Sequence, residues 1–97
     1  MVVINLYVIL VYDIVMDKKG AKVSKNIFKI CKKYLTHIQK SVFEGNLTEL
    51  NCMKLRMELN EYIRNDKDSV LLFKSRDEKW LQKEFLGIVD DKTSNFF

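Results

Sequence analysis

The sequence predicts a single α+β domain with a ferredoxin-like βαββαβ sheet and one extra strand towards its C-terminal end. Three observations support this fold class. The chain has 97 residues, which suffices for one hydrophobic core but not for two. Segments with strand-like and helix-like hydrophobic periodicity follow each other in the required order. Hydrophobic residues make up 47% of the chain and include six phenylalanines, which excludes disorder as its dominant state.

The first segment, residues 2–14, has the period of two that is typical of a strand. Its apolar side chains fall on both faces: Leu6, Val8, Leu10 and Tyr12 share one face, and Tyr7, Ile9 and Val11 share the other. A strand that is apolar on both faces is buried on both, so we expect it at the centre of the sheet. Asp13 then places a carboxylate at the C-terminal end of this strand.

A turn at residues 17–20 leads into a helix that we expect over residues 21–34. Its apolar stripe and its lysine stripe occupy different faces, with Val23, Ile27, Ile30, Cys31 and Tyr34 in the first and Lys22, Lys25, Lys29 and Lys32 in the second. A helix start flanked by Lys18, Lys19 and Lys22 opposes the helix dipole but suits a bound phosphate. The alternative is that the small cost of these lysines is tolerated without a ligand.

The middle of the chain predicts a short β structure and a second helix. Residues 36–47 predict either a tight hairpin or one sharply bent strand. Thr48 is the expected N-cap of a helix that continues to about Arg64. A polar turn at residues 65–68 follows, and the run 69–73, apolar from Val70 onward, predicts another central strand.

The C-terminal end carries more apolar surface than a ferredoxin-like unit needs. Six large side chains lie in residues 79–89, namely Trp80, Leu81, Phe85, Leu86, Ile88 and Val89. On a monomer they would form an exposed patch of a size that soluble monomers avoid. We therefore expect residues 1–78 to form the domain and residues 79–97 to form an extension that packs on the partner subunit of a homodimer.

The positive charge is concentrated in one block. Residues 18–40 contain eight lysines and no acidic residue, whereas the rest of the chain carries nine basic and thirteen acidic residues. The one-sided block indicates a polyanionic partner, and nucleic acid is the favoured one. A solvated helix face is the alternative, although mixed charges at helical spacing would support such a face better.

Several classes of function and location are excluded or disfavoured. The three glycines are too far apart for a phosphate-binding loop, and His37 is the only histidine available to a catalytic triad or a zinc site. Cys31 and Cys52 fall among apolar helical positions, so we expect buried free thiols. The longest apolar run, residues 6–12, is too short to span a membrane, and the first residues lack the features of a signal peptide. We expect a cytoplasmic protein without membrane contact.

Three segments of the sequence resemble one known family, the small CRISPR-associated endonucleases of spacer acquisition. The segments are residues 7–13 (YVILVYD), 34–48 (YLTHIQKSVFEGNLT) and 68–73 (DSVLLF), and the Leu86–Gly87 pair also fits. The similarity covers nearly the whole chain. It implies a homodimer of ferredoxin-like subunits whose C-terminal strands exchange, a divalent metal such as Mg²⁺, and nuclease activity on single-stranded RNA or double-stranded DNA. It also implies partnership with the CRISPR integrase.

The resemblance assigns Asp13 as the catalytic residue and the metal ligand, since it matches the family aspartate that faces its symmetry mate across the dimer. Mg²⁺ is often held by one or two carboxylates plus substrate phosphate, so a doubled Asp13 meets the minimum. Asp17 is a less favoured ligand. The expected nucleic-acid contacts are Lys18, Lys19, Lys22 and Lys25, which stand where some members have arginines. Lysine keeps the charge but loses the bidentate geometry, so binding is better supported than catalysis.

Three functions therefore stay open. The first is a Mg²⁺-dependent endonuclease, and the second is a non-catalytic duplex-binding subunit of the integration complex. The third and weakest is a toxin-type ribonuclease or a generic RNA binder. His37 is expected to be a hydrogen-bonded strand residue, and Ser41, Phe43 and Glu44 are not assigned to catalysis.

Overall fold

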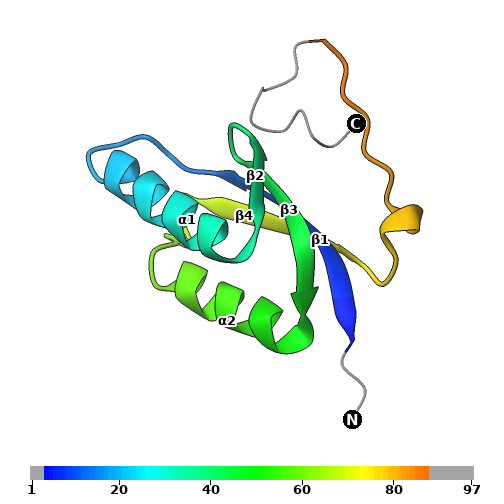
Figure 1. Cartoon of the computed structure of the whole chain (residues 1–97). Coiled ribbons are helices and arrows are strands. Elements are labelled where there is room, and N and C mark those ends of the chain that lie inside the picture. Colours follow the sequence, from blue (N-terminus) through cyan, green and yellow to red (C-terminus); the bar gives the residue numbers. More distant parts are fainter. Residues whose placement is uncertain (1–3, 88–97) are drawn as a thin grey trace.

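The computed structural model describes residues 4–87, which fold as one antiparallel sheet with two helices on one face (Figure 1). The elements, in chain order, are β1 (Asn5–Asp13), α1 (Gly20–Tyr34), β2 (Thr36–Gln39), β3 (Val42–Thr48), α2 (Glu49–Asn60), β4 (Ser69–Ser75) and the short 3-10 helix η1 (Glu78–Trp80). The strand order β2-β3-β1-β4 is that of a ferredoxin-like βαββαβ unit, which confirms the predicted fold class. Neither helix of this described part has the length and hydrophobicity that crossing a membrane would need.

The centre of the sheet is β1, as its two apolar faces predict. It pairs antiparallel with β3 from Asn5↔Thr48 to Val11↔Val42 and with β4 from Tyr7↔Ser75 to Asp13↔Ser69. The next two strands, β2 and β3, form the tight hairpin rather than one bent strand, and Lys40 adopts a positive φ of 42° at its turn.

The core lies between the sheet and the two helices. Its fully buried side chains come from every layer: Val8, Leu10, Ile27, Cys31, Phe43, Leu55 and Leu59. Both cysteines are buried free thiols, as predicted, and burial raises the pKa of Cys31 to about 12. The side chain of Thr48 accepts a hydrogen bond from the Asn51 amide at 3.1 Å, which confirms it as the N-cap of α2.

The prediction that residues 69–73 form a central strand is wrong, because β4 lies at the edge of this chain's sheet. Val70 and Leu72 pack on the core, whereas Leu71 and Phe73 point to the opposite face and are 58% and 50% exposed. The run is apolar on both sides although helices cover only one face of the sheet. Leu71 and Phe73 therefore stay exposed on the other face.

The second helix also ends earlier than predicted, at Asn60 instead of Arg64. The amides of Tyr62 and Ile63 both donate to the Leu59 carbonyl, and the chain then turns so that the Arg64 amide donates to Asp68 at 3.0 Å. For the Arg64 amide, the Asp68 carboxylate thus replaces the carbonyl acceptor that a continuing helix would supply. Hydrophobic periodicity alone does not reveal this change of acceptor.

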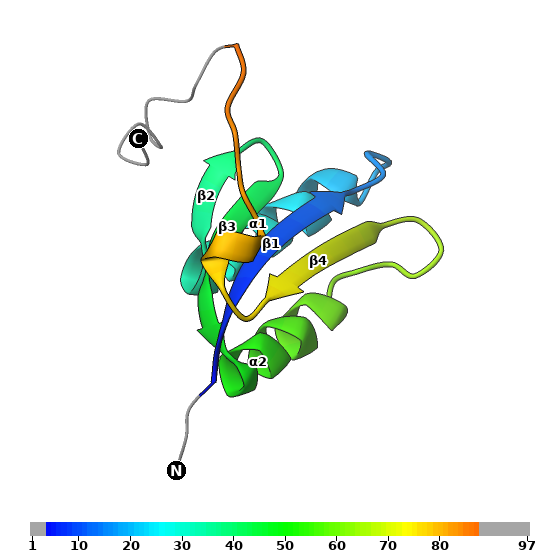
Figure 2. The same ribbon diagram turned by 90° about the vertical axis from the view of Figure 1, so that its right-hand side faces the viewer.

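The C-terminal segment forms no strand within the described residues. Residues 78–80 make η1, residues 81–87 have no regular structure, and positions 88–97 lie outside the described part. Figure 2 looks onto the face of the sheet that the helices leave open, with η1 and the segment after it in front. A fifth strand needs a neighbour to pair with, so packing on a partner subunit stays a prediction.

Gly20 is required where the loop after β1 enters α1. A Cβ at this position would collide with the carbonyl oxygen of Val15, which is held in place because it accepts a hydrogen bond from Arg64 at 2.7 Å. The loop and the helix can approach this closely only without a side chain.

We expect Gly20→Ala to destabilise the fold by about 1–3 kcal/mol, because the clash forces the loop away from the helix. The same change inside an ordinary helix stabilises by roughly 0.5–1 kcal/mol, so the sign of the effect is diagnostic. Urea unfolding measures it. A Gly20→Ala protein as stable as the wild type would show that the loop gives way without cost.

Candidate nucleic-acid interface

The carboxylate of Asp13 stands at the open end of β1. Asp13 is the last residue of the strand, is exposed, and pairs with Ser69 of β4. It lies on the face opposite the helices, as Val11 and Ile9 do. Within residues 4–87 no three His, Cys, Asp or Glu side chains come close enough together to hold a metal ion. Asp13 therefore belongs to no such cluster within the described residues.

The loop between Asp13 and α1 is held by a buried ion pair that sequence reasoning missed. Asp68 accepts hydrogen bonds from Arg64 Nε at 2.8 Å and Nη2 at 2.9 Å, and its other partners are the backbone amides of Arg64 and Val15 at 3.0 Å each. These hydrogen bonds, the Arg64 side chain first, lower the pKa of Asp68 to about 2. We call this Arg64–Asp68–Val15 arrangement the clasp, because it ties the loop after β1 to the turn before β4.

The clasp also engages Asp17. Arg64 Nη1 donates to one Asp17 oxygen at 2.6 Å, and Lys67 Nζ donates to the other at 2.9 Å. These two cations hold the pKa of Asp17 well below its usual range. Both oxygens accept hydrogen bonds from protein donors, so Asp17 helps to hold the loop. The only sequence signal was the i,i+4 spacing of Arg64 and Asp68.

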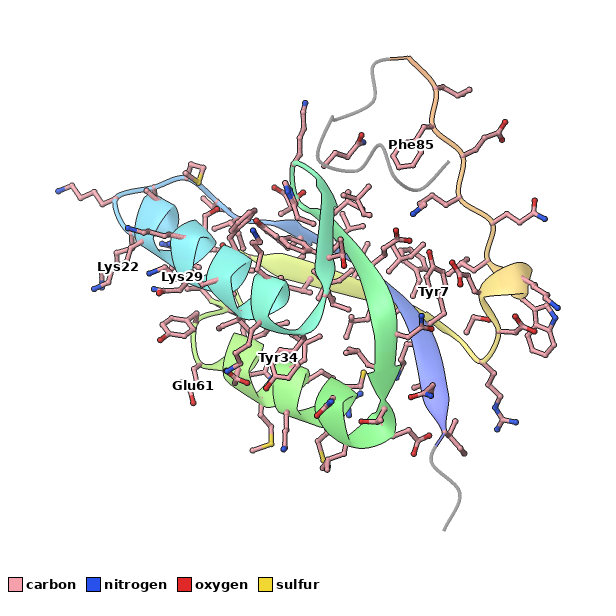
Figure 3. The ribbon with its side chains drawn as sticks, in the orientation of Figure 1. Tyr7, Lys22, Lys29, Tyr34, Glu61 and Phe85 are labelled. Atoms are coloured by element: carbon pink, nitrogen blue, oxygen red, sulfur yellow. The ribbon has the colours of Figure 1, made fainter. Side chains whose placement is uncertain are left out.

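The lysine block forms an uncompensated basic surface along α1. Lys19 at the N-cap makes no side-chain capping bond, and the first turn of the helix contains no acidic residue. Of the eight lysines in residues 18–40, Lys33 alone has an ion-pair partner in the described part of the chain, namely Glu58. Lys18 and Lys19 line a hollow at the start of the helix, and Figure 3 shows Lys22 and Lys29 projecting from α1 away from the sheet.

The structure thus brings the four predicted nucleic-acid contacts, Lys18, Lys19, Lys22 and Lys25, to the loop and the first turns of α1, at the same end of β1 as Asp13. Asp13 and the lysine-bearing helix lie on opposite faces of the sheet. A polyanion that reaches both must pass around this end of the sheet.

His37, Ser41 and Phe43, which lie in the family-like segment 34–48, make structural contacts. Phe43 is fully buried, and the His37 ring packs 4.9 Å from it while its Nε2 lies 2.8 Å from the Lys40 carbonyl. The carbonyl of Ser41 accepts a hydrogen bond from the Tyr12 amide at 3.2 Å. These contacts confirm the hydrogen-bonded role expected of His37 and show that Phe43 packs in the core, while Ser41 contributes through its backbone.

Glu44 is a buried carboxylate on the open face and was not assigned a role from the sequence. It accepts hydrogen bonds from the Tyr7 hydroxyl and from Lys83 of the C-terminal segment. Burial, with the Glu44 hydrogen bond second, raises the pKa of Tyr7 well above its usual value. Residues 83–85 border the same small hollow as Ile9 and Val42, so the C-terminal segment lies against the open face in this chain (Figure 3).

A small ferredoxin-like sheet with a strand-end carboxylate and a lysine-rich helix is suited to the class of proteins that handle nucleic acids. The profile of one family, described as CRISPR associated protein Cas2, matches residues 6–83. A CRISPR-associated endoribonuclease Cas2 from Fusobacterium nucleatum is 54% identical over 92 residues, which cover 95% of this chain and 87% of the relative. Another CRISPR-associated endoribonuclease Cas2, from Moorella thermoacetica, is 40% identical, and the match covers 91% of this chain and 98% of the relative.

Solved structures agree with the sequence relatives. A crystal structure of a Cas2 protein superposes with a TM-score of 0.77 at 30% identity, over 90% of this chain and 92% of that one. The crystal structure of Streptococcus pyogenes Cas2 gives a TM-score of 0.75 at 26% identity, over 84% of this chain and 99% of that one. The chain belongs to the Cas2 family of CRISPR-associated proteins. This confirms the predicted family, and the relatives' names are those of nucleases.

The clasp predicts an acid-sensitive loss of stability. Because the pKa of Asp68 in the folded protein, about 2, lies below the ordinary value of about 3.9, its ionised form stabilises the fold above pH 4. That stabilisation is lost as the pH falls from about 4 through 2. We expect Asp68→Asn to lower stability at pH 7 by about 1–3 kcal/mol and to flatten this acid limb.

Urea unfolding across this pH range measures both effects. The exposed Asp66→Asn change in the same turn is the matched control and should follow the wild type. Identical acid limbs for wild type and Asp68→Asn would show that Asp68 does not carry the dependence.

Proposed function

We propose that this chain is a Mg²⁺-dependent endonuclease that works as a homodimer with the CRISPR integrase in spacer acquisition in the cytoplasm, on single-stranded RNA, duplex DNA or both. The observation that carries the proposal is the lysine surface of α1, whose first turn contains no acidic residue and which begins at the same end of β1 as the exposed Asp13 carboxylate, on the other face of the sheet. Phosphates bound by the lysines would run past this carboxylate. Such contacts position a nucleic acid without reading its sequence.

Asp13 suits a magnesium site that is shared between two subunits. Mg²⁺ keeps several waters and needs only one or two carboxylates plus a substrate phosphate, and one chain supplies one such carboxylate. A bound ion would supply a more acidic water and neutralise charge on the phosphodiester. In this proposal Asp13 binds the ion, and the clasp fixes the loop that follows Asp13. The phosphates of the substrate are held by Lys18, Lys19, Lys22 and Lys25.

The open face of the sheet supports the homodimer. Its residues include Ile9, Val11, Leu71 and Phe73, and the last two are half exposed or more. An apolar sheet face of this kind is suited to a second copy of itself about a two-fold axis. Because Asp13 lies on the same face, this axis would bring two copies of Asp13 toward each other.

A duplex-binding subunit without cleavage is the second candidate. It is favoured because, within the described residues, Asp13 belongs to no cluster of three possible metal ligands. It is also favoured because lysines stand at positions where bidentate arginines would hold a phosphate more rigidly. The two candidates share the basic surface and the dimer, and they differ only in the role of Asp13.

Replacement of Asp13 separates them. We expect Asp13→Asn to abolish Mg²⁺-dependent cleavage of labelled RNA and duplex DNA, while dimerisation and nucleic-acid affinity are retained. Mg²⁺ should raise the melting temperature of the wild type and leave that of the variant unchanged, because only the wild type carries the paired carboxylates. The exposed Asp66→Asn change serves as the control. A wild type that bridges integrase on duplex DNA and never cleaves would establish the second candidate.

The lysine surface predicts a strong salt dependence of binding. We expect the double change Lys22→Ala and Lys25→Ala to weaken binding at low salt and to reduce the slope of log affinity against log salt by roughly one unit per lost phosphate contact. Lys54→Ala, an exposed lysine of α2, is the control. An unchanged slope would place the bound nucleic acid elsewhere on the protein.

The open face predicts that dimerisation depends on Phe73. We expect Phe73→Lys to give a folded monomer in sedimentation, since it places a charge in the apolar face without disturbing the core. Met57→Lys, at an exposed apolar position of α2, should stay dimeric. Truncation after Arg76 tests the predicted role of the C-terminal extension, and a truncated protein that remains a well-behaved dimer would contradict that role.

A further inference from the structure

A groove with an apolar floor and a basic rim runs along α1, on the helix-covered side of the sheet end. Its volume is about 670 Å³, within the usual range of ligand sites. Tyr12 and Met16 border it from β1 and the following loop, and α1 contributes one face: Ala21, Ser24, Lys25, Phe28, Lys29 and Lys32. Along the helix axis these residues span roughly 16 Å, which exceeds the size of one nucleoside.

The rim of the groove is positively charged throughout. Three of its residues are lysines, and no acidic side chain of the described chain lines it. Lys25, Lys29 and Lys32 have no ion-pair partner within residues 4–87, so their charge is available to a ligand. The occupant is therefore an anion.

The floor of the groove is aromatic and rigid. The Phe28 ring packs edge-to-face against Phe43 at 5.4 Å and against His37 at 4.9 Å, so the core holds its orientation. Lys32 Nζ lies 5.9 Å from the centre of the same ring. An aromatic ring beside ammonium groups is suited to a flat π-system that carries negative charge next to it.

We infer that this groove binds the base of an unpaired nucleotide, with the flanking phosphates on Lys25, Lys29 and Lys32. Bases inside a duplex are stacked on one another and cannot enter such a groove, so the ligand is a single-stranded segment, a frayed end or an extruded nucleotide. The inference rests on the proposed nucleic-acid function. It adds that the chain distinguishes single-stranded from paired substrate by a base pocket next to the end of β1.

A groove-filling substitution tests the inference. Ala21 is exposed on α1, so Ala21→Trp fills the groove without changing charge or removing a core contact. Met57→Trp, on an exposed turn of α2 away from the groove, is the matched control. The probes are a short single-stranded oligonucleotide, the same strand with abasic sites, and a blunt duplex of equal length.

We expect the wild type and Met57→Trp to bind the intact strand about tenfold more tightly than the abasic strand, as base stacking on an aromatic side chain implies. Ala21→Trp should bind both strands equally and bind the duplex within about twofold of the wild type. The inference is overturned by a wild type that does not distinguish the two strands, or by an Ala21→Trp protein that still does.

Thermal unfolding shows whether Ala21→Trp folds. If it does not fold, a second variant tests the inference. The double change Lys29→Gln and Lys32→Gln should weaken binding of the intact strand about fivefold more than binding of the duplex. Equal weakening of both probes would overturn the inference, as would a polyglutamate peptide that matches the intact strand in affinity. A wild type that cleaves or binds duplex without preferring intact single strand refutes this inference alone. Failure to bind or cleave any probe refutes the proposed function as well.

Discussion

Two helices cover only one face of a four-stranded sheet, and in this chain the other face is also apolar along much of β1 and β4. The constraint acts first on β1, which must be hydrophobic on both sides, and then on β4, whose Leu71 and Phe73 point away from the core. Burial of that second face requires material from outside the βαββαβ unit. The C-terminal segment covers part of this face, where Lys83 forms an ion pair with Glu44. A second copy of the chain would cover the rest. Assembly and the proposed pairing of Asp13 thus have one physical origin.

The end of β1 is the second place where several features depend on one arrangement. Asp68 is buried and satisfied only because Arg64 and the Val15 amide reach it, and Arg64 in turn holds the Val15 carbonyl beside Gly20. The loop between Asp13 and α1 is therefore fixed at both ends. A rigid loop keeps the carboxylate, the lysines and the groove in a constant relation, which a site built on a mobile loop would lack.

The charges are separated between the two helices. The α1 helix carries lysines that lack acidic neighbours, whereas α2 begins with Glu49 and supplies Glu58, which accepts hydrogen bonds from Lys33 and Tyr34. Among the described residues, Lys33, which faces α2, is the one lysine of the block that has an acidic partner. This leaves the outer surface of α1 and the groove beside it with several lysines that have no ion-pair partner within residues 4–87. A surface of this kind is suited to a polyanion.

By itself the sequence determined the fold class, the central place of β1, the Thr48 cap, the buried cysteines and the family, because periodicity, caps and charge runs are local signals, whereas it left the choice between a hairpin and a bent strand at residues 36–47 to the structure. It also indicated Asp13 and Lys18, Lys19, Lys22 and Lys25 as candidates, whose roles remain predictions. Only the tertiary structure decided that β4 is an edge strand, that α2 ends at Asn60, and that Arg64, Asp68 and Asp17 form one network. The groove likewise appears only when Tyr12 and Phe28 are brought together. These features join residues that are distant along the chain, and a one-dimensional pattern carries no information on which distant residues meet.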